Sequence, residues 1–164
     1  MSERTNTSEL EDMQRSRYLA FTVGSETYGI EIGNVKEIIG LQPITPLPEA
    51  PGHVKGIINL RGRIIPVVSS RLRFGMPEAD YTDRTCIVVI QSADADVGLV
   101  VDSVSEVLPI NEENIVPPPA LQPSGKAAVV RGIGMVGNDV KLLLDCQTLF
   151  CDEERSIYEK EINL

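Results

Sequence analysis

Few residues of this 164-residue chain have the types and spacing that chemistry requires. Residues 132–137 read Gly-Ile-Gly-Met-Val-Gly, which matches the G-x-G-x-x-G pattern of dinucleotide-binding loops. Such a loop must follow a strand and open a helix, with an acidic residue about 20 positions later. Here an Asn-Asp turn and the strand-like run Val140–Leu144 follow instead. The pattern therefore indicates a strand and a turn, and we expect no bound nucleotide.

The other candidates for catalysis or metal binding are weak. The single histidine, His53, follows a Pro-Gly pair and has no nucleophile or carboxylate at a workable spacing. Cys146 and Cys151 are four residues apart in a chain with three cysteines, whereas a structural zinc site needs four ligands. Asp94 and Asp96 fall in an expected turn, where aspartate is common. We therefore predict that the chain is not an enzyme and needs no metal or cofactor.

One segment reverses the charge of the rest of the chain. The sequence carries a formal net charge of −9, yet residues 50–77 contain five basic residues and no acidic one. These are Lys55, Arg61, Arg63, Arg71 and Arg73. The turn Asn59-Leu60-Arg61-Gly62-Arg63 is either a solvated hairpin or a contact surface for an acidic partner. We favour the contact surface, because arginine is frequent at interface hot spots.

The elements that would hold these residues occur twice in the chain. Residues 28–39 align without a gap with residues 97–108, and residues 54–74 align with residues 130–150. A repeat of this length indicates one supersecondary unit that is used twice, and hence two similar subdomains that share a core. We predict that one near-twofold operation superposes both pairs of segments.

The local pattern predicts short strands in both halves. The expected hairpins cover residues 18–32 and 57–68 in the first half and residues 87–101 and 133–144 in the second. Alternating apolar residues and Gly or Asn turns are typical of hairpins. Pro66 cannot donate a ladder hydrogen bond, so its strand should be an edge or bulged there. Residues 146–150 are expected to form a short helix.

Short helical turns are expected after the first hairpin of each half. Asn34 and Ser103 are residues that cap helices. Val35, Ile38 and Ile39 have the spacing of one helical face. Four to five strands per half with such short connections favour two small β-barrels over a βαβ arrangement.

Composition excludes several classes of function. The chain has no apolar run of about 18 residues, so we expect no membrane span, and its polar N-terminus has no secretory signal. An odd number of cysteines is typical of a reducing cytoplasm. The negative charge and an aromatic content of 4% argue against nucleic-acid binding.

Several of these runs resemble the CheW family of bacterial chemotaxis. They are Tyr28–Ile32, Val35-x-Glu37-Ile38, Lys55–Gly62, Pro66–Val68 and Gly98–Val104. The resemblance implies an all-β fold of two similar SH3-like, five-stranded β-barrel subdomains with a shared core and short helices. It places a CheW-like domain at residues 17–151, with a first barrel at roughly 24–85 and a second at roughly 86–145. A flexible segment, 1–16, precedes this domain, and a C-terminal helix or tail, 152–164, follows it.

The resemblance also implies a function. CheW proteins are cytoplasmic, non-catalytic adaptors that couple the tips of transmembrane chemoreceptors to the regulatory domain of the histidine kinase CheA, at receptor arrays next to the inner membrane. A receptor or kinase interface is then expected at Val35, Glu37, Gly56, Asn59, Leu60, Arg61, Arg63 and Val104, with Glu37 and Arg61 paired. Ser69-Ser70 replaces the Asp-Leu that the family usually has, which affects a cap or a salt bridge. The alternative is a ligand-binding or enzymatic barrel protein with a pocket between its halves.

Overall fold

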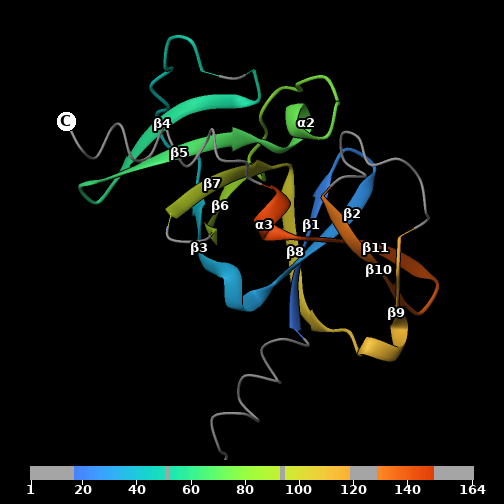
Figure 1. The fold of residues 1–164 in the computed structure, drawn as a ribbon. Coiled ribbons are helices and arrows are strands. Elements are labelled where there is room, and N and C mark those ends of the chain that lie inside the picture. Colours follow the sequence, from blue (N-terminus) through green and yellow to red (C-terminus); the bar gives the residue numbers. More distant parts are fainter. Residues whose placement is uncertain (1–16, 51, 93–94, 119–128, 150–164) are drawn as a thin grey trace, which may run out of the picture.

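Short strands, mostly in antiparallel pairs, make up most of the described part of the molecule. The structure is a computed structural model that describes residues 17–50, 52–92, 95–118 and 129–149 (Figure 1). Within these ranges the helical elements are short: η1 (Ile32–Asn34), α2 (Ser70–Arg73), η2 (Glu112–Asn114) and α3 (Cys146–Leu149). The expected segments 1–16 and 152–164, and also Asp94 and Cys151, lie outside the described residues. The all-β fold class is confirmed.

The strands follow the expected hairpins closely. The first half contains β1 (Arg17–Val23), β2 (Glu26–Glu31), β3 (Val35–Gly40), β4 (Val54–Leu60) and β5 (Arg63–Ser69). The second half contains β6 (Cys86–Ser92), β7 (Ala95–Val101), β8 (Ser103–Pro109), β9 (Ile115–Val116), β10 (Val130–Val136) and β11 (Asp139–Leu144). The aligned segments of the two halves have the same strands, except that η1 has no helical counterpart at residues 101–103.

The two halves exchange their first hairpins. One sheet has the order β8-β1-β2-β11-β10-β9, and the other has the order β3-β6-β7-β5-β4. Hairpin β1–β2 therefore belongs to the sheet of the second half, and hairpin β6–β7 belongs to the sheet of the first half. The expected barrel boundaries, 24–85 and 86–145, are wrong for this reason: each barrel combines strands from both ranges.

Both sheets have the same strand order and register. Parallel pairing joins Leu143 to Gly29 in one sheet and Val67 to Gly98 in the other, and the sequence alignment matches these two pairs with each other. The sheets differ only at one edge, where the two-residue strand β9 pairs with β10 but the first half has an isolated bridge, Thr45 to Ile57. This edge accounts for six named strands in one sheet and five in the other.

Gly29 and Gly98, which are identical in the two copies, leave room for packed side chains of neighbouring strands. A Cβ at Gly29 would lie 2.9 Å from a methyl group of Leu143, and one at Gly98 would lie 2.8 Å from a methyl group of Ile87. Contacts under 3.0 Å force a neighbour to move. A side chain at either glycine would therefore require the packed methyl group beside it to shift.

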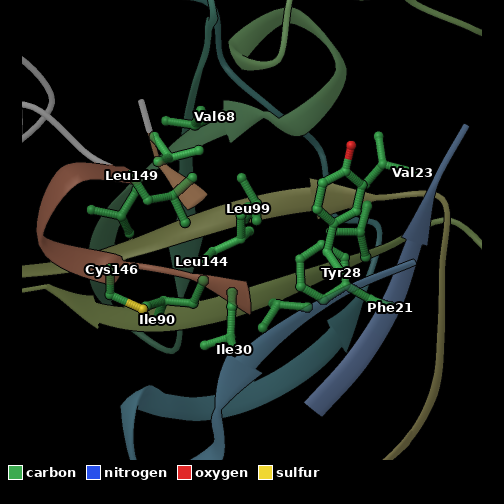
Figure 2. Close-up of a cluster of buried hydrophobic side chains, with 14 of the residues drawn as sticks. Phe21, Val23, Tyr28, Ile30, Val68, Ile90, Leu99, Leu144, Cys146 and Leu149 are labelled. Atoms are coloured by element: carbon green, nitrogen blue, oxygen red, sulfur yellow. The ribbon is translucent and has the colours of Figure 1, made fainter. Parts of the chain in front are cut away.

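The exchanged hairpins are buried on both faces. In β1, Leu19 packs in a core shared by the two sheets, whereas Ala20 packs inside the six-stranded sheet. In β6, Val88 packs in the shared core and Val89 inside the five-stranded sheet. Figure 2 shows side chains of both hairpins and of α3 meeting in this shared core. The expectation of a shared core is confirmed.

The helical turns expected at 34–38 and 103–107 are wrong, because these segments are the strands β3 and β8. In β3 the half-buried positions alternate with exposed ones, which is the period of a strand. Val35, Ile38 and Ile39 are β-branched residues, and pairing with β6 overrides their helical spacing. Only η1, which ends at Asn34, is helical here.

Two other local predictions concern β5. Pro66 lies in an internal strand, but the ladder between β5 and β7 begins only at Val67, so no hydrogen bond to β7 is required of Pro66. Ser69, which stands where the family usually has aspartate, is the N-cap of α2, and its hydroxyl accepts a hydrogen bond from the Leu72 N–H at 3.2 Å. The serine therefore keeps the capping role.

Asp102, between β7 and β8, joins three parts of the chain. Arg71 donates two hydrogen bonds to its carboxylate, at 3.0 and 2.6 Å, and the Gly24 N–H donates a third at 2.8 Å. Burial alone would raise the pKa of Asp102, but the hydrogen bonds from Arg71 and Gly24 and the charge of Arg71 hold it below its ordinary value. The ionised carboxylate thus fastens α2 and the β1–β2 turn to the second half.

We predict that Ser69→Ala destabilises the fold by about 1 kcal/mol, the usual cost of a lost N-cap. Ser69→Asp should keep the cap, because Asp145 occupies the aligned position in the second half and its side chain accepts a hydrogen bond from the Gln147 N–H at 2.9 Å. Urea denaturation of the three proteins measures this. Equal losses of stability in Ser69→Ala and Ser69→Asp would show that the effect does not come from loss of the N-cap.

Asp102→Asn should lower stability at pH 7 by about 1–2 kcal/mol, because charged hydrogen bonds contribute more than neutral ones. A carboxyl with a lowered folded pKa stabilises the fold above its unfolded pKa of about 4 and loses that contribution as the pH falls through the folded value. The stability difference between wild type and variant should therefore be constant above about pH 5 and should shrink below about pH 4. Denaturation midpoints of both proteins, measured from about pH 7 to below about pH 4, test this expectation. A stability difference that does not change with pH would contradict the role assigned to the ionised carboxylate.

Candidate functional site

The turn between β4 and β5 is a tight two-residue hairpin. Leu60 pairs with Arg63, and the two central residues have positive φ, 53° for Arg61 and 86° for Gly62. Positive φ at both positions defines the type I′ turn, whose twist matches that of the strands. The Asn59 side chain accepts a hydrogen bond from the Gly62 N–H at 2.8 Å and so fixes the tip. We call residues 59–63 the contact hairpin.

Arg61 forms an ion pair with Glu37 of β3, as expected. The side chains are 68% and 32% exposed, respectively. In the sheet order β3 and β4 are opposite edges, so this pair and the apolar cluster of Ile39, Leu60 and Ile58 span the seam of the barrel. An exposed pair of this kind contributes about 0–1 kcal/mol to stability. Its effect is to orient Arg61 at the tip.

Arg63 pairs with Asp96, an acidic residue that sequence reasoning assigned to a plain turn. The Asp96 carboxylate is only 4% exposed, and Lys36 Nζ lies 3.6 Å from it on another side. Buried acids are almost always paired. The alignment of the two copies contains a signal for this pair. Arg63 and Asp96 differ in charge from the residues aligned with them, Asp139 and Thr27.

The basic segment is not an excess of positive charge in space. Besides Arg61 and Arg63, Lys55 pairs with Glu78, and this hydrogen bond is the main reason why the pKa of Lys55 is raised. Arg71 pairs with Asp102, and Arg73 donates hydrogen bonds to the carbonyl groups of Thr148 and Leu149, both at 3.1 Å. All five bases have partners within the fold. Four of these bases are therefore held in ion pairs, and Arg73 is held by carbonyl groups.

The remaining expected interface residues have different surroundings. Gly56, with φ 146°, is buried, and a Cβ there would lie 2.1 Å from the Thr45 carbonyl oxygen, so its role is to admit the 45–57 bridge. Leu60 is buried inside the barrel. Val35 and Val104 are half-buried against the shared core, in β3 and β8 of different sheets. Glu37, Asn59, Arg61 and Arg63 are thus the residues that the structure brings to one exposed site.

The second barrel presents an apolar surface at the equivalent place. Met135 and Val140 pair across β10 and β11 and are 42% and 49% exposed, and Val116 of the neighbouring β9 is also exposed. Beside them a groove of about 510 Å³ is lined by residues 25–27 and 139–142. We call Val116, Met135 and Val140 the apolar patch.

Three observations bear on the expectations about a metal, a pocket between the halves and a reactive thiol. Among the described residues, no cluster of histidine, cysteine and acidic side chains could hold a metal ion. The region between the two sheets, where the alternative function needs a pocket, is filled by the shared core. Burial, followed by the nearby charges of Asp145 and Glu31, raises the pKa of the Cys146 thiol to about 12, so it stays protonated. None of the helices in the described part is long and apolar enough to cross a bilayer.

Comparison with known proteins places this chain in a family. Residues 17–154 match the family model described as the CheW-like domain. The chain is 34% identical over 142 residues to a protein named chemotaxis protein CheW from Klebsiella aerogenes, with 87% of this chain and 86% of the relative covered. It is 37% identical over 137 residues to the CheW of Rhizobium meliloti, with 84% and 88% covered.

A further relative and a solved structure agree with this match. Protein FrzA of Myxococcus xanthus is 30% identical over 119 residues, with 73% of this chain and 72% of the relative covered. The crystal structure of the scaffolding protein TtCheW from Thermoanaerobacter tengcongensis resembles this structure with a TM-score of 0.77 and 34% identity, over 83% of this chain and 92% of that one. The chain belongs to the CheW-like domain family.

Proposed function

We propose that this protein is a non-catalytic adaptor that couples chemoreceptors to the histidine kinase CheA. The observation that carries the proposal is the exposed, ion-paired contact hairpin in a chain of the CheW-like domain family. The fold does not need this polar tip, because the same turn in the second copy has Gly137 in place of Arg61. Such an adaptor would act in the cytoplasm, at receptor arrays next to the inner membrane.

The two barrels suit chemically different partners. The contact hairpin offers the exposed Arg61 guanidinium together with the Glu37 carboxylate, and these can exchange their mutual pairing for polar groups of a receptor tip. The apolar patch offers uncharged surface, which is typical of the centre of a stable interface. We therefore assign the receptor to the first barrel and the regulatory domain of the kinase to the second.

Arg61→Ala should leave the free energy of unfolding within about 0.5 kcal/mol of wild type, as for surface sites without special roles. It should weaken binding of a receptor tip by about 1 kcal/mol or more, because an arginine desolvated in an interface is a typical hot spot. Thermal unfolding and titration with a receptor-tip fragment measure the two effects.

The exposed Arg84, in the loop before β6, provides the matched control, and Arg84→Ala should change neither quantity. A large loss of stability in Arg61→Ala would assign that residue a structural role. If stability and affinity for both partners stayed at the wild-type values, the contact hairpin would not be a binding surface.

Met135→Asn tests the apolar patch with a substitution that the fold already uses, because Asn59 occupies the aligned, exposed position in the first copy. We expect binding of the kinase regulatory domain to weaken by about 1 kcal/mol or more through loss of buried apolar area. Receptor-tip binding should not change. If Met135→Asn weakened receptor binding instead, the assignment of partners to barrels would be reversed.

A further inference from the structure

The tip of the contact hairpin extends beyond the hydrogen-bonded part of its sheet. The ladder between β5 and β7 begins at Val67, so the first part of β5, Arg63–Pro66, has no pairing with β7. On its other side the hairpin ends with β4, an edge strand whose outer contact is the single bridge from Ile57 to Thr45. Among the described residues, backbone hydrogen bonds therefore hold the tip only through the hairpin itself.

Ion pairs fasten the tip to both neighbouring strands. Arg61 reaches Glu37 of β3, and Arg63 reaches Asp96 of β7. The second pair differs from the first in its burial, since the Asp96 carboxylate is 4% exposed and the Glu37 carboxylate 32%. Salt screens a buried pair much less than an exposed one. The Arg63–Asp96 contact is thus the more persistent of the two links.

Lys36 connects the two ion pairs through a β-bulge. In the pairing of β3 with β6, Val35 faces Ile90 and Glu37 faces Val89, so Lys36 is the extra residue. A bulge of this kind re-aims side chains. Lys36 lies 3.6 Å from Asp96, while its neighbour Glu37 holds Arg61. Asp96 is therefore the acid around which β3, β5 and β7 meet.

The second copy shows that the fold itself does not need this arrangement. The same bulge exists in β8, where Ser105 takes the place of Lys36 and donates a hydrogen bond to the Ala20 carbonyl at 3.1 Å. Thr27 takes the place of Asp96, and Asp139 takes the place of Arg63. The equivalent sheet keeps the same strand order and register with Ser105 and Thr27 in place of Lys36 and Asp96, and with the acid Asp139 in place of the base Arg63.

We propose that Asp96 is a positioning residue that holds the contact hairpin, through Arg63 and Lys36, in the orientation in which Arg61 meets its partner. This inference rests on the proposed function for its binding consequence only. The mechanical consequence, a tip fastened to β7, is a property of the free protein. Loss of the carboxylate charge should therefore loosen residues 60–63 before it affects any partner.

The test compares Asp96→Asn with Asp102→Asn, which removes another Arg-paired carboxylate that does not contact the contact hairpin. Amide hydrogen exchange of residues 60–63 in the free protein should become about threefold faster or more in Asp96→Asn, measured relative to the core strand β6. Asp102→Asn should not change this ratio, and Asp96→Glu should restore it in part. An unchanged ratio in Asp96→Asn would overturn the proposal.

Binding separates this inference from the proposed function. Receptor-tip affinity should fall about threefold or more in Asp96→Asn, and the substitution should have no further effect in an Arg61→Ala background, because Asp96 acts through the hairpin. Equal losses in both backgrounds would show that Asp96 does not act through Arg61 and would overturn the positioning role. If exchange accelerates while neither Asp96→Asn nor Arg61→Ala weakens binding, the mechanical role stands and the proposed contact surface fails.

Discussion

The structure depends on the burial of two hairpins on both of their faces. Strands β1–β2 and β6–β7 each fill the interior of one barrel with alternate side chains and the shared core with the others. A hairpin with one solvent-exposed face can pack within its own half. A hairpin that is apolar on both faces must be covered by an apolar surface on each face. Exchange between the halves satisfies this requirement, and it makes the two barrels one cooperative unit.

This constraint explains why the sequence repeat predicted the strands well and the barrels poorly. Ungapped matches between the copies fixed the aligned strands, because hairpin patterns are local. Whether a hairpin pairs within its own half or with the other half is decided by contacts between distant residues. Because the two halves have similar strands, the local sequence pattern is compatible with either pairing. The apolar run Val97–Val101 was the available hint in the sequence, and in the structure all seven residues of β7 are buried. The mistaken helical turns at β3 and β8 show the ambiguity of short apolar runs, which only pairing resolves.

The candidate site was predictable only in part. The Glu37–Arg61 pair followed from the family resemblance and is present. In the sequence, the charge reversal of residues 50–77 indicated a contact surface for an acidic partner, but in the fold acids and carbonyl groups from distant parts of the chain pair with these bases. Asp96 was missed because an aspartate near a turn is ordinary in sequence. Gly56 and Leu60 belong to the same sequence motif as Arg61, yet both are buried and have structural roles in the hairpin.

The two barrels thus share one backbone design and differ in what they expose. Aligned positions hold Asn59 and Met135, Arg61 and Gly137, or Asp96 and Thr27, and each difference lies at the same end of equivalent strands. Because the register is conserved, a substitution at one of these positions changes the chemistry of a surface without moving the frame beneath it. Duplication therefore lets one end become charged and ion-paired while the other presents the apolar patch. Under the proposed function these two surfaces would serve two unlike partners, and the shared core joins the barrels that carry them.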